Sequence, residues 1–173
     1  MDDLNFDNPA WFINKFEENV VPEGITFNMI LNLASVCNAE NSDILWGFIE
    51  NYQPNIDKKK SKFLSKLLEY GVSYYKTFIL PNKRYRDPSD VEKKCLIELI
   101  DKLEKIDENS DSESIQNILY EIGNNSPFKN LKDWFKCFYE VILGQSEGPR
   151  IGSFVKFYGL KKTIDLLKLR LEI

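Results

Sequence analysis

Histidine is absent from all 173 residues of this chain. Its absence excludes Ser–His and Cys–His nucleophile pairs, histidine metal ligands and histidine acid–base catalysis. Catalysis by carboxylates or lysines remains open, but no pair of such residues stands out in the sequence. We therefore expect no catalytic residue in this chain.

Cysteine is scarce, and long apolar runs are missing. Cys37, Cys95 and Cys137 are too widely spaced for a disulfide framework or a zinc site, so we expect reduced, mostly buried thiols and no metal. No run reaches the roughly 18 apolar residues that cross a bilayer, and residues 1–3 are acidic where a signal peptide would be basic. We expect a cytoplasmic location and no membrane partner.

Apolar residues are plentiful by contrast, at 43% of the chain with twelve Phe, eight Tyr and three Trp. They recur at spacings of three and four, which is typical of amphipathic helices, and no segment alternates as a strand does. The sequence predicts an all-α bundle of seven to nine helices over residues 25–173, with residues 1–24 as a connector. The expected helices cover 26–38, 44–52, 63–79, 87–106, 112–122, 131–143, 151–158 and 163–171.

Charge is unevenly distributed along a chain whose net charge is −4. Residues 58–94 hold eleven Lys/Arg and four Asp/Glu, a net +7, and residues 127–173 hold nine and five, a net +4. The overall acidity disfavours a non-specific nucleic-acid coat, and we expect no DNA partner. The two basic segments still permit a local patch for a polyanion.

A glycine-rich turn separates two helical patterns near the end of the chain. Gly144 is expected to close the first helix in the left-handed conformation, and Pro149 to occupy the first turn of the next helix. Arg150 and the free first-turn N–H groups could then bind a phosphate or a base. The alternative interpretation is a tight turn between helices and nothing more.

A second candidate is the segment Tyr74–Arg86, where Lys83, Arg84 and Arg86 flank an aromatic residue. Aromatic rings stack on unpaired bases, while Arg and Lys hold phosphates or base edges. The alternative is a basic loop in water beside helical core residues.

Four segments in order carry a family resemblance: Asn28–Glu40, Leu45–Ile49, Tyr74–Arg86 and Gly144–Gly152. Together they resemble the C-terminal half of class I lysyl-tRNA synthetases, from about Pro22 to the end of the chain. The Gly-Pro-Arg turn before an aromatic helix is also similar to the last helices of glutamyl-tRNA synthetases. The resemblance implies a helical cage of the class I aminoacyl-tRNA synthetase anticodon-binding type.

The resemblance also implies what this chain lacks. In the whole enzyme a separate nucleotide-binding fold joins lysine to ATP and then to the tRNA, using a two-histidine motif and a Lys-Met-Ser-Lys-Ser loop. Neither motif is present here. The implied partners are therefore tRNA(Lys) and a catalytic domain preceding the 1–24 connector. We expect no cofactor in this chain, since ATP and Mg belong to that catalytic domain, and no aminoacylation by this chain alone.

By position in the related enzymes, the anticodon-facing residues lie on the penultimate long helix and just after the glycine turn. The resulting tRNA-binding set is Lys136, Tyr139, Gly148, Pro149, Arg150 and Ile151, with Lys83, Arg84 and Arg86 as a more distant contact. The competing hypothesis is a helical protein-interaction module without RNA binding. The periodicity also predicts that Leu167 faces the core.

Overall fold

The computed structural model describes residues 21–173, and these form eight α-helices without a strand. The predicted all-α class and helix number are thereby confirmed. The connector predicted over 1–24 lies almost wholly outside the described residues. The helices are α2 Phe27–Val36, α3 Ser42–Tyr52, α4 Lys62–Tyr74, α5 Asp90–Leu103, α6 Ser112–Asn125, α7 Leu131–Phe138, α8 Ile151–Tyr158 and α9 Leu160–Leu171.

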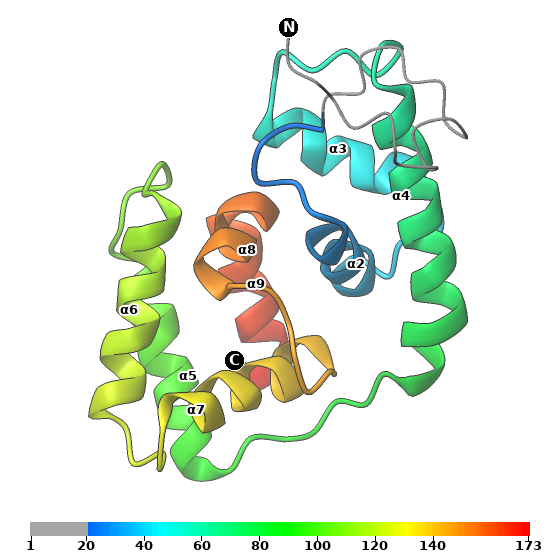
Figure 1. Cartoon of the computed structure of the whole chain (residues 1–173). Helices are drawn as coiled ribbons and strands as arrows, with labels where there is room; N and C mark the ends of the chain where they lie inside the picture. Colours follow the sequence, from blue (N-terminus) through cyan, green and yellow to red (C-terminus); the bar gives the residue numbers. More distant parts are fainter. Residues whose placement is uncertain (1–20) are drawn as a thin grey trace, which may run out of the picture.

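The helices fall into two groups joined by an extended connection (Figure 1). Helices α2, α3 and α4 form one group, α5 to α9 form the other, and residues 83–89 run between them. The groups touch where α3 packs against α8 and where α2 packs against the turn Tyr139–Leu143 that follows α7. Apolar side chains from both groups form one continuous core.

Two helices end in π turns instead of continuing as α-helix. The helix predicted over 63–79 is α-helical to Tyr74 and then forms a π turn, η1 Tyr75–Ile79, followed by a short 3-10 turn, η2 Leu80–Asn82. The helix predicted over 131–143 likewise ends in η3 Tyr139–Leu143. Apolar spacing does not distinguish such turns from α-helix, because both return side chains to one face.

Side-chain caps determine where α3, α5 and α6 begin. Helix α3 is capped by Asn41, whose side chain accepts hydrogen bonds from the Asp43 and Ile44 amides. Helix α5 begins after Ser89, three residues later than predicted, because Ser89 and Glu92 form a reciprocal capping box. Asp111 caps α6 by accepting from the amide of Ser114. In each of these helices the side chain that accepts the capping hydrogen bond belongs to the residue just before the first helical residue.

Helix α6 continues past Gly123 to Asn125, three residues beyond its predicted end at 122. A Cβ at Gly123 would lie 2.6 Å from atoms of Leu131 and Trp134. The missing side chain thus lets the start of α7 pack closely against α6. The indole N–H of Trp134 donates to the Leu119 carbonyl oxygen at 3.0 Å, which fixes that contact.

Candidate nucleic-acid interface

Gly144 ends the π turn η3 in the left-handed conformation, with φ of 68°, as the sequence predicted. A Cβ there would be 3.0 Å from side-chain atoms of Lys83 and Tyr85, so glycine also makes room for the extended connection. The Arg84 amide donates to the Gly144 carbonyl oxygen at 2.9 Å. The two segments singled out from the sequence, 74–86 and 144–152, therefore meet at Gly144.

A cavity of about 650 Å³ lies between α7, η3 and the loop after Gly144. We call it the loop pocket. It brings together three of the predicted residues, Lys136, Tyr139 and Gly148. Sequence reasoning missed Lys132 and Phe135, although their helical spacing to Lys136 and Tyr139 puts them on the same face. The full lining is Lys132, Phe135, Lys136, Tyr139, Ser146, Glu147 and Gly148.

Tyr139 holds this loop in place. Its hydroxyl donates to the Pro149 carbonyl oxygen at 2.6 Å, and its ring would be 2.5 Å from a Cβ at Gly148. Burial raises the pKa of the Tyr139 phenol to about 12, so the hydroxyl stays protonated and remains a donor at neutral pH. Tyr139 thus acts as a wall and an anchor of the loop pocket.

The start of α8 differs from its expected form. Arg150 is the N-cap residue and Pro149 precedes it, so Pro149 is not in the first turn of the helix. Pro149 and Ile151 are buried, and the amide of Gly152 donates to Oε1 of Gln116 on α6 at 2.9 Å. The Gly152 N–H is therefore already hydrogen-bonded within the protein. It is not among the free first-turn N–H groups that the sequence predicted for a phosphate or a base.

Arg150 itself remains accessible. Its side chain is 47% exposed and forms a 2.5 Å ion pair with Glu113, which is more exposed still. Exposed ion pairs contribute little to stability and exchange readily with other partners. The guanidinium can therefore leave Glu113 for a phosphate or a base edge.

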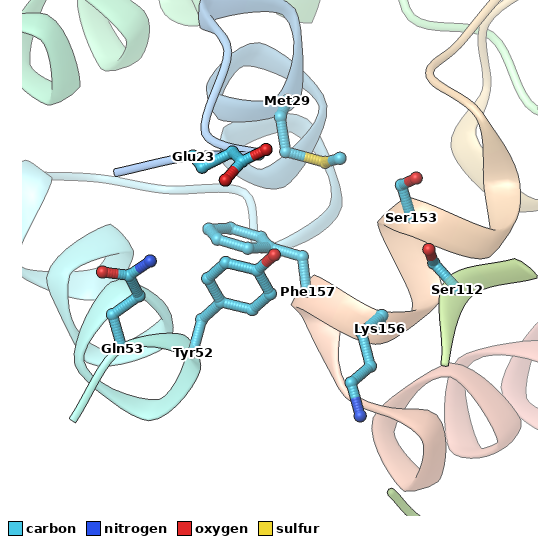
Figure 2. A pocket seen from close by; sticks show the side chains of 9 residues that line it. Glu23, Met29, Tyr52, Gln53, Ser112, Ser153, Lys156 and Phe157 are labelled. Atoms are coloured by element: carbon cyan, nitrogen blue, oxygen red, sulfur yellow. The ribbon is translucent and has the colours of Figure 1, made fainter. Parts of the chain in front are cut away.

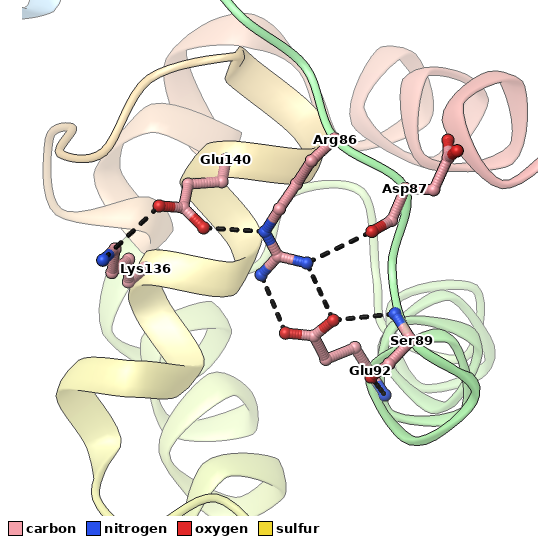
Figure 3. A network of polar contacts seen from close by, with 6 residues as sticks. All are labelled: Arg86, Asp87, Ser89, Glu92, Lys136 and Glu140. Atoms are coloured by element: carbon pink, nitrogen blue, oxygen red, sulfur yellow. Dashed lines mark hydrogen bonds and ion pairs between the residues drawn. The ribbon is translucent and has the colours of Figure 1, made fainter.

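Arg86 is embedded in a polar network instead of facing solvent freely (Figure 3). Its Nη atoms donate to both carboxylate oxygens of Glu92 at 2.8 Å, and its Nε donates to Glu140 at 2.7 Å. Glu140 also lies 3.6 Å from Nζ of Lys136. These bonds raise the pKa of Arg86 and tie the extended connection to α5 and η3. Arg86 thereby positions the elements around the loop pocket.

Glu92 makes this network sensitive to acid. The hydrogen bond from Arg86 lowers the pKa of Glu92 from 4.5 to about 2. A carboxylate with a depressed pKa in the folded state stabilises above its unfolded pKa and loses that contribution as pH falls from about 4.5 to 2. Glu92→Gln should therefore lower the free energy of unfolding by ~2 kcal/mol at pH 7 and flatten its dependence on pH in that window.

Urea unfolding between pH 2 and 7 measures this difference. Glu121→Gln is the matched control, because Glu121 pairs with Lys102 at an exposed position. An equally steep acid dependence in the Glu92→Gln variant and in the unaltered chain would contradict the assigned role.

Lys83 is also held by protein groups. Its Nζ donates to the Ser35 carbonyl oxygen at 2.5 Å and lies 5.1 Å from the centre of the Tyr85 ring. Burial, with Arg170 nearby, lowers the pKa of Lys83 to about 8. Arg84 is exposed but donates to the Pro81 and Lys83 carbonyl oxygens. Of the predicted Lys83, Arg84 and Arg86, Arg84 is thus an exposed cation whose side-chain hydrogen bonds within residues 21–173 are to backbone oxygens alone.

Comparison with curated proteins gives relatives over nearly the whole chain. A protein of Rickettsia felis named lysine–tRNA ligase is 41% identical over 167 residues, which is 94% of this chain. A Rickettsia bellii protein of the same name is 39% identical over 170 residues, or 96% of this chain. This chain is homologous to part of a lysine–tRNA ligase.

The chain spans about a third of the lysine–tRNA ligases that it matches, 31% of the Rickettsia felis protein and 32% of the Rickettsia bellii protein. No protein-family model matches the chain. No solved structure matches it either. The relationship to lysine–tRNA ligases therefore rests on the sequence relatives.

A different cavity, of about 440 Å³, opens between α2, α3 and α8 (Figure 2). Tyr52 and Phe157 form its aromatic wall, with ring centres 4.9 Å apart, while Glu23 and Lys156 lie on its rim. No residue predicted to bind tRNA lines it.

Within residues 21–173 no cluster of His, Cys, Asp or Glu could hold a metal ion, and none of the helices there is long and apolar enough to cross a bilayer.

The cysteines agree with their expected state. Cys37, Cys95 and Cys137 are free thiols, the last two buried and Cys37 half-buried. Burial raises the pKa of Cys37 and Cys137 to about 12, so these thiols are neutral and poorly nucleophilic.

Proposed function

We propose that this chain is the anticodon-binding domain for tRNA(Lys) of a class I lysine–tRNA ligase. The observation that carries the proposal is homology to lysine–tRNA ligases over 94–96% of the chain but only about a third of those proteins. A chain without histidine, made of helices in its described part, fits a tRNA-reading part better than a nucleotide-activating one. ATP, magnesium and the joining of lysine to tRNA would belong to a catalytic domain outside this chain.

The loop pocket and Arg150 would read the anticodon together. Lysine tRNA has a U-rich anticodon, and uracil stacks weakly, so hydrogen bonds to its edge should matter more than stacking. Arg150 offers up to five N–H donors, and Lys136 offers an exposed ammonium for a phosphate. Tyr139 would fix the loop against which the base lies. In this proposal Tyr139 anchors the loop, and Arg150 and Lys136 are the cations that contact the RNA.

Binding of tRNA(Lys) and of the same tRNA with an altered anticodon tests the proposal. We expect the 173-residue chain to prefer the unaltered tRNA at a fixed salt concentration, because phosphate contacts alone would not discriminate between the two. Equal, weak binding to both would exclude anticodon reading and favour a helical protein-interaction module.

Arg150→Ala should weaken the binding of tRNA(Lys) by about 1–3 kcal/mol if Arg150 contacts a base. Its effect on thermal stability should be small, since the pair with Glu113 is exposed. Glu113→Gln is the matched control: it breaks the same pair, leaves Arg150 in place and should not weaken binding. An unchanged affinity of the Arg150→Ala variant would remove Arg150 from the interface.

A further inference from the structure

Three large aromatic side chains lie exposed in a row on the outer face of α4 and η1. Tyr70, Tyr74 and Phe78 are 65%, 44% and 57% exposed. The Tyr74 and Phe78 rings are 4.9 Å apart, and the ring of Phe27 on α2 meets Tyr74 edge-on at 6.3 Å. We call Tyr70, Tyr74 and Phe78 the aromatic stripe.

The π turn η1 brings Phe78 back toward the side of the helix that carries Tyr70. Along an α-helix, a step of four residues overshoots a full turn by about 40°, so Tyr74 is rotated relative to Tyr70. The wider π turn η1 needs more residues per turn, so the next step of four falls short and returns Phe78 toward Tyr70. The three rings therefore lie closer to one face than the same residues would on a continuous α-helix.

Positive charge lies further toward the start of α4. Lys66 and Lys62 precede Tyr70 by four and eight residues on α4, and both are exposed. They belong to the segment 58–94, whose net charge is +7 in a chain of net −4. The centres of protein–protein interfaces are depleted in charge, whereas single-stranded nucleic acid is held by aromatic rings beside cations. Exposed rings with exposed lysines on the same helix thus favour RNA over a protein.

The aromatic stripe is also continuous with the loop pocket. Phe78 lines a smaller cavity of about 290 Å³ together with Asn82, Lys83 and Gly144. Ser146 and Glu147 line both this cavity and the loop pocket. A nucleic-acid strand leaving the loop pocket would therefore reach Phe78 first, then Tyr74 and Tyr70.

We propose that the aromatic stripe is a second RNA-binding surface, on which unpaired bases next to the anticodon stack. Lys62 and Lys66 hold phosphates of the same strand. This inference rests on the proposed function, and it assigns the loop pocket to edge recognition and the aromatic stripe to stacking. Stacking on rings is tolerant of base identity, so the aromatic stripe contributes affinity without choosing the anticodon.

The test uses the 173-residue chain with Tyr74→Leu and Phe78→Leu combined. Leucine preserves much of the apolar surface but removes the rings, and both positions are exposed, so the fold should hold. We expect binding of tRNA(Lys) to weaken by about tenfold or more, with the preference over the altered anticodon retained. Tyr74→Phe is the matched control; it keeps the ring and should bind normally.

The lysines are tested by salt dependence. Lys62→Gln with Lys66→Gln should reduce the slope of log affinity against log salt, because two phosphate contacts are lost. Lys94→Gln with Lys105→Gln, two exposed lysines on and just after α5, should leave the slope unchanged.

The outcomes separate the two proposals. If the double leucine variant binds tRNA(Lys) as tightly as the unaltered chain, and both discriminate between anticodons, the stacking surface is overturned while the anticodon-binding function stands. The aromatic stripe would then be a protein-docking face. If the unaltered chain does not discriminate, the proposed function fails first.

Discussion

Leu167→Asp should destabilise the chain by about 4 kcal/mol or more, enough to unfold much of the population. Leu167 on α9 is 0% exposed, which confirms its predicted core position. Helix α9 packs against α5 and η3. An aspartate there must either bury a charge or bind a proton, and both cost free energy. Thermal and urea unfolding by circular dichroism measure the loss.

Leu169→Asp is the control for that prediction. Leu169 lies two residues further along α9 and is 71% exposed. The same substitution should change stability by less than about 0.5 kcal/mol. Similar effects at positions 167 and 169 would show that helix propensity, and not burial, governs the response.

Gly152→Ala should destabilise the chain by ~3 kcal/mol, although it adds only one methyl group. Helix α8 crosses α6 at this glycine, and an added Cβ would overlap the backbone carbonyl oxygen of Ser112 and lie 2.9 Å from the amide nitrogen of Gln116. Backbone atoms cannot rotate aside as a side chain can. The helices must separate, and the hydrogen bond from the Gly152 amide to Gln116 is strained or lost.

Gly47→Ala gives the opposite expectation and serves as the control. Gly47 lies within α3, and nothing is within 4 Å of a Cβ placed there. Alanine should stabilise by roughly 0.5–1 kcal/mol, because it restricts the unfolded chain and favours helix. The two variants compared by urea unfolding should thus move in opposite directions; a loss of stability at both positions would contradict the argument from space.

The helices were predictable because apolar spacing reports the face that is buried. Leu167 illustrates this, since its periodic neighbours on α9 sufficed to place it in the core. Local hydrogen-bond chemistry was less predictable. Asn41, Ser89 and Asp111 cap their helices, and each lies among several polar residues that compete for that role.

The candidate interface was predictable in part. Lys136, Tyr139 and Gly148 meet in one pocket, as a helix next to a glycine turn suggests. The ion pair between Arg86 and Glu140 joins residues 54 positions apart, and the hydrogen bond from the Gly152 amide to Gln116 joins residues 36 positions apart. No local pattern reveals which distant carboxylate or amide a cation or N–H will meet. Sequence reasoning therefore identified accessible residue types but not their existing partners.

The two helical groups are joined by the extended connection over 83–89 and pack against each other as two subunits of a dimer would. Within residues 21–173 the chain passes between the groups once, and the contacts of α3 with α8 and of α2 with η3 hold them together. If the chain were nicked in this connection, those contacts would become an interface between two polypeptides. Their association would then depend on concentration by mass action, whereas the intact chain supplies the second group at a fixed effective concentration.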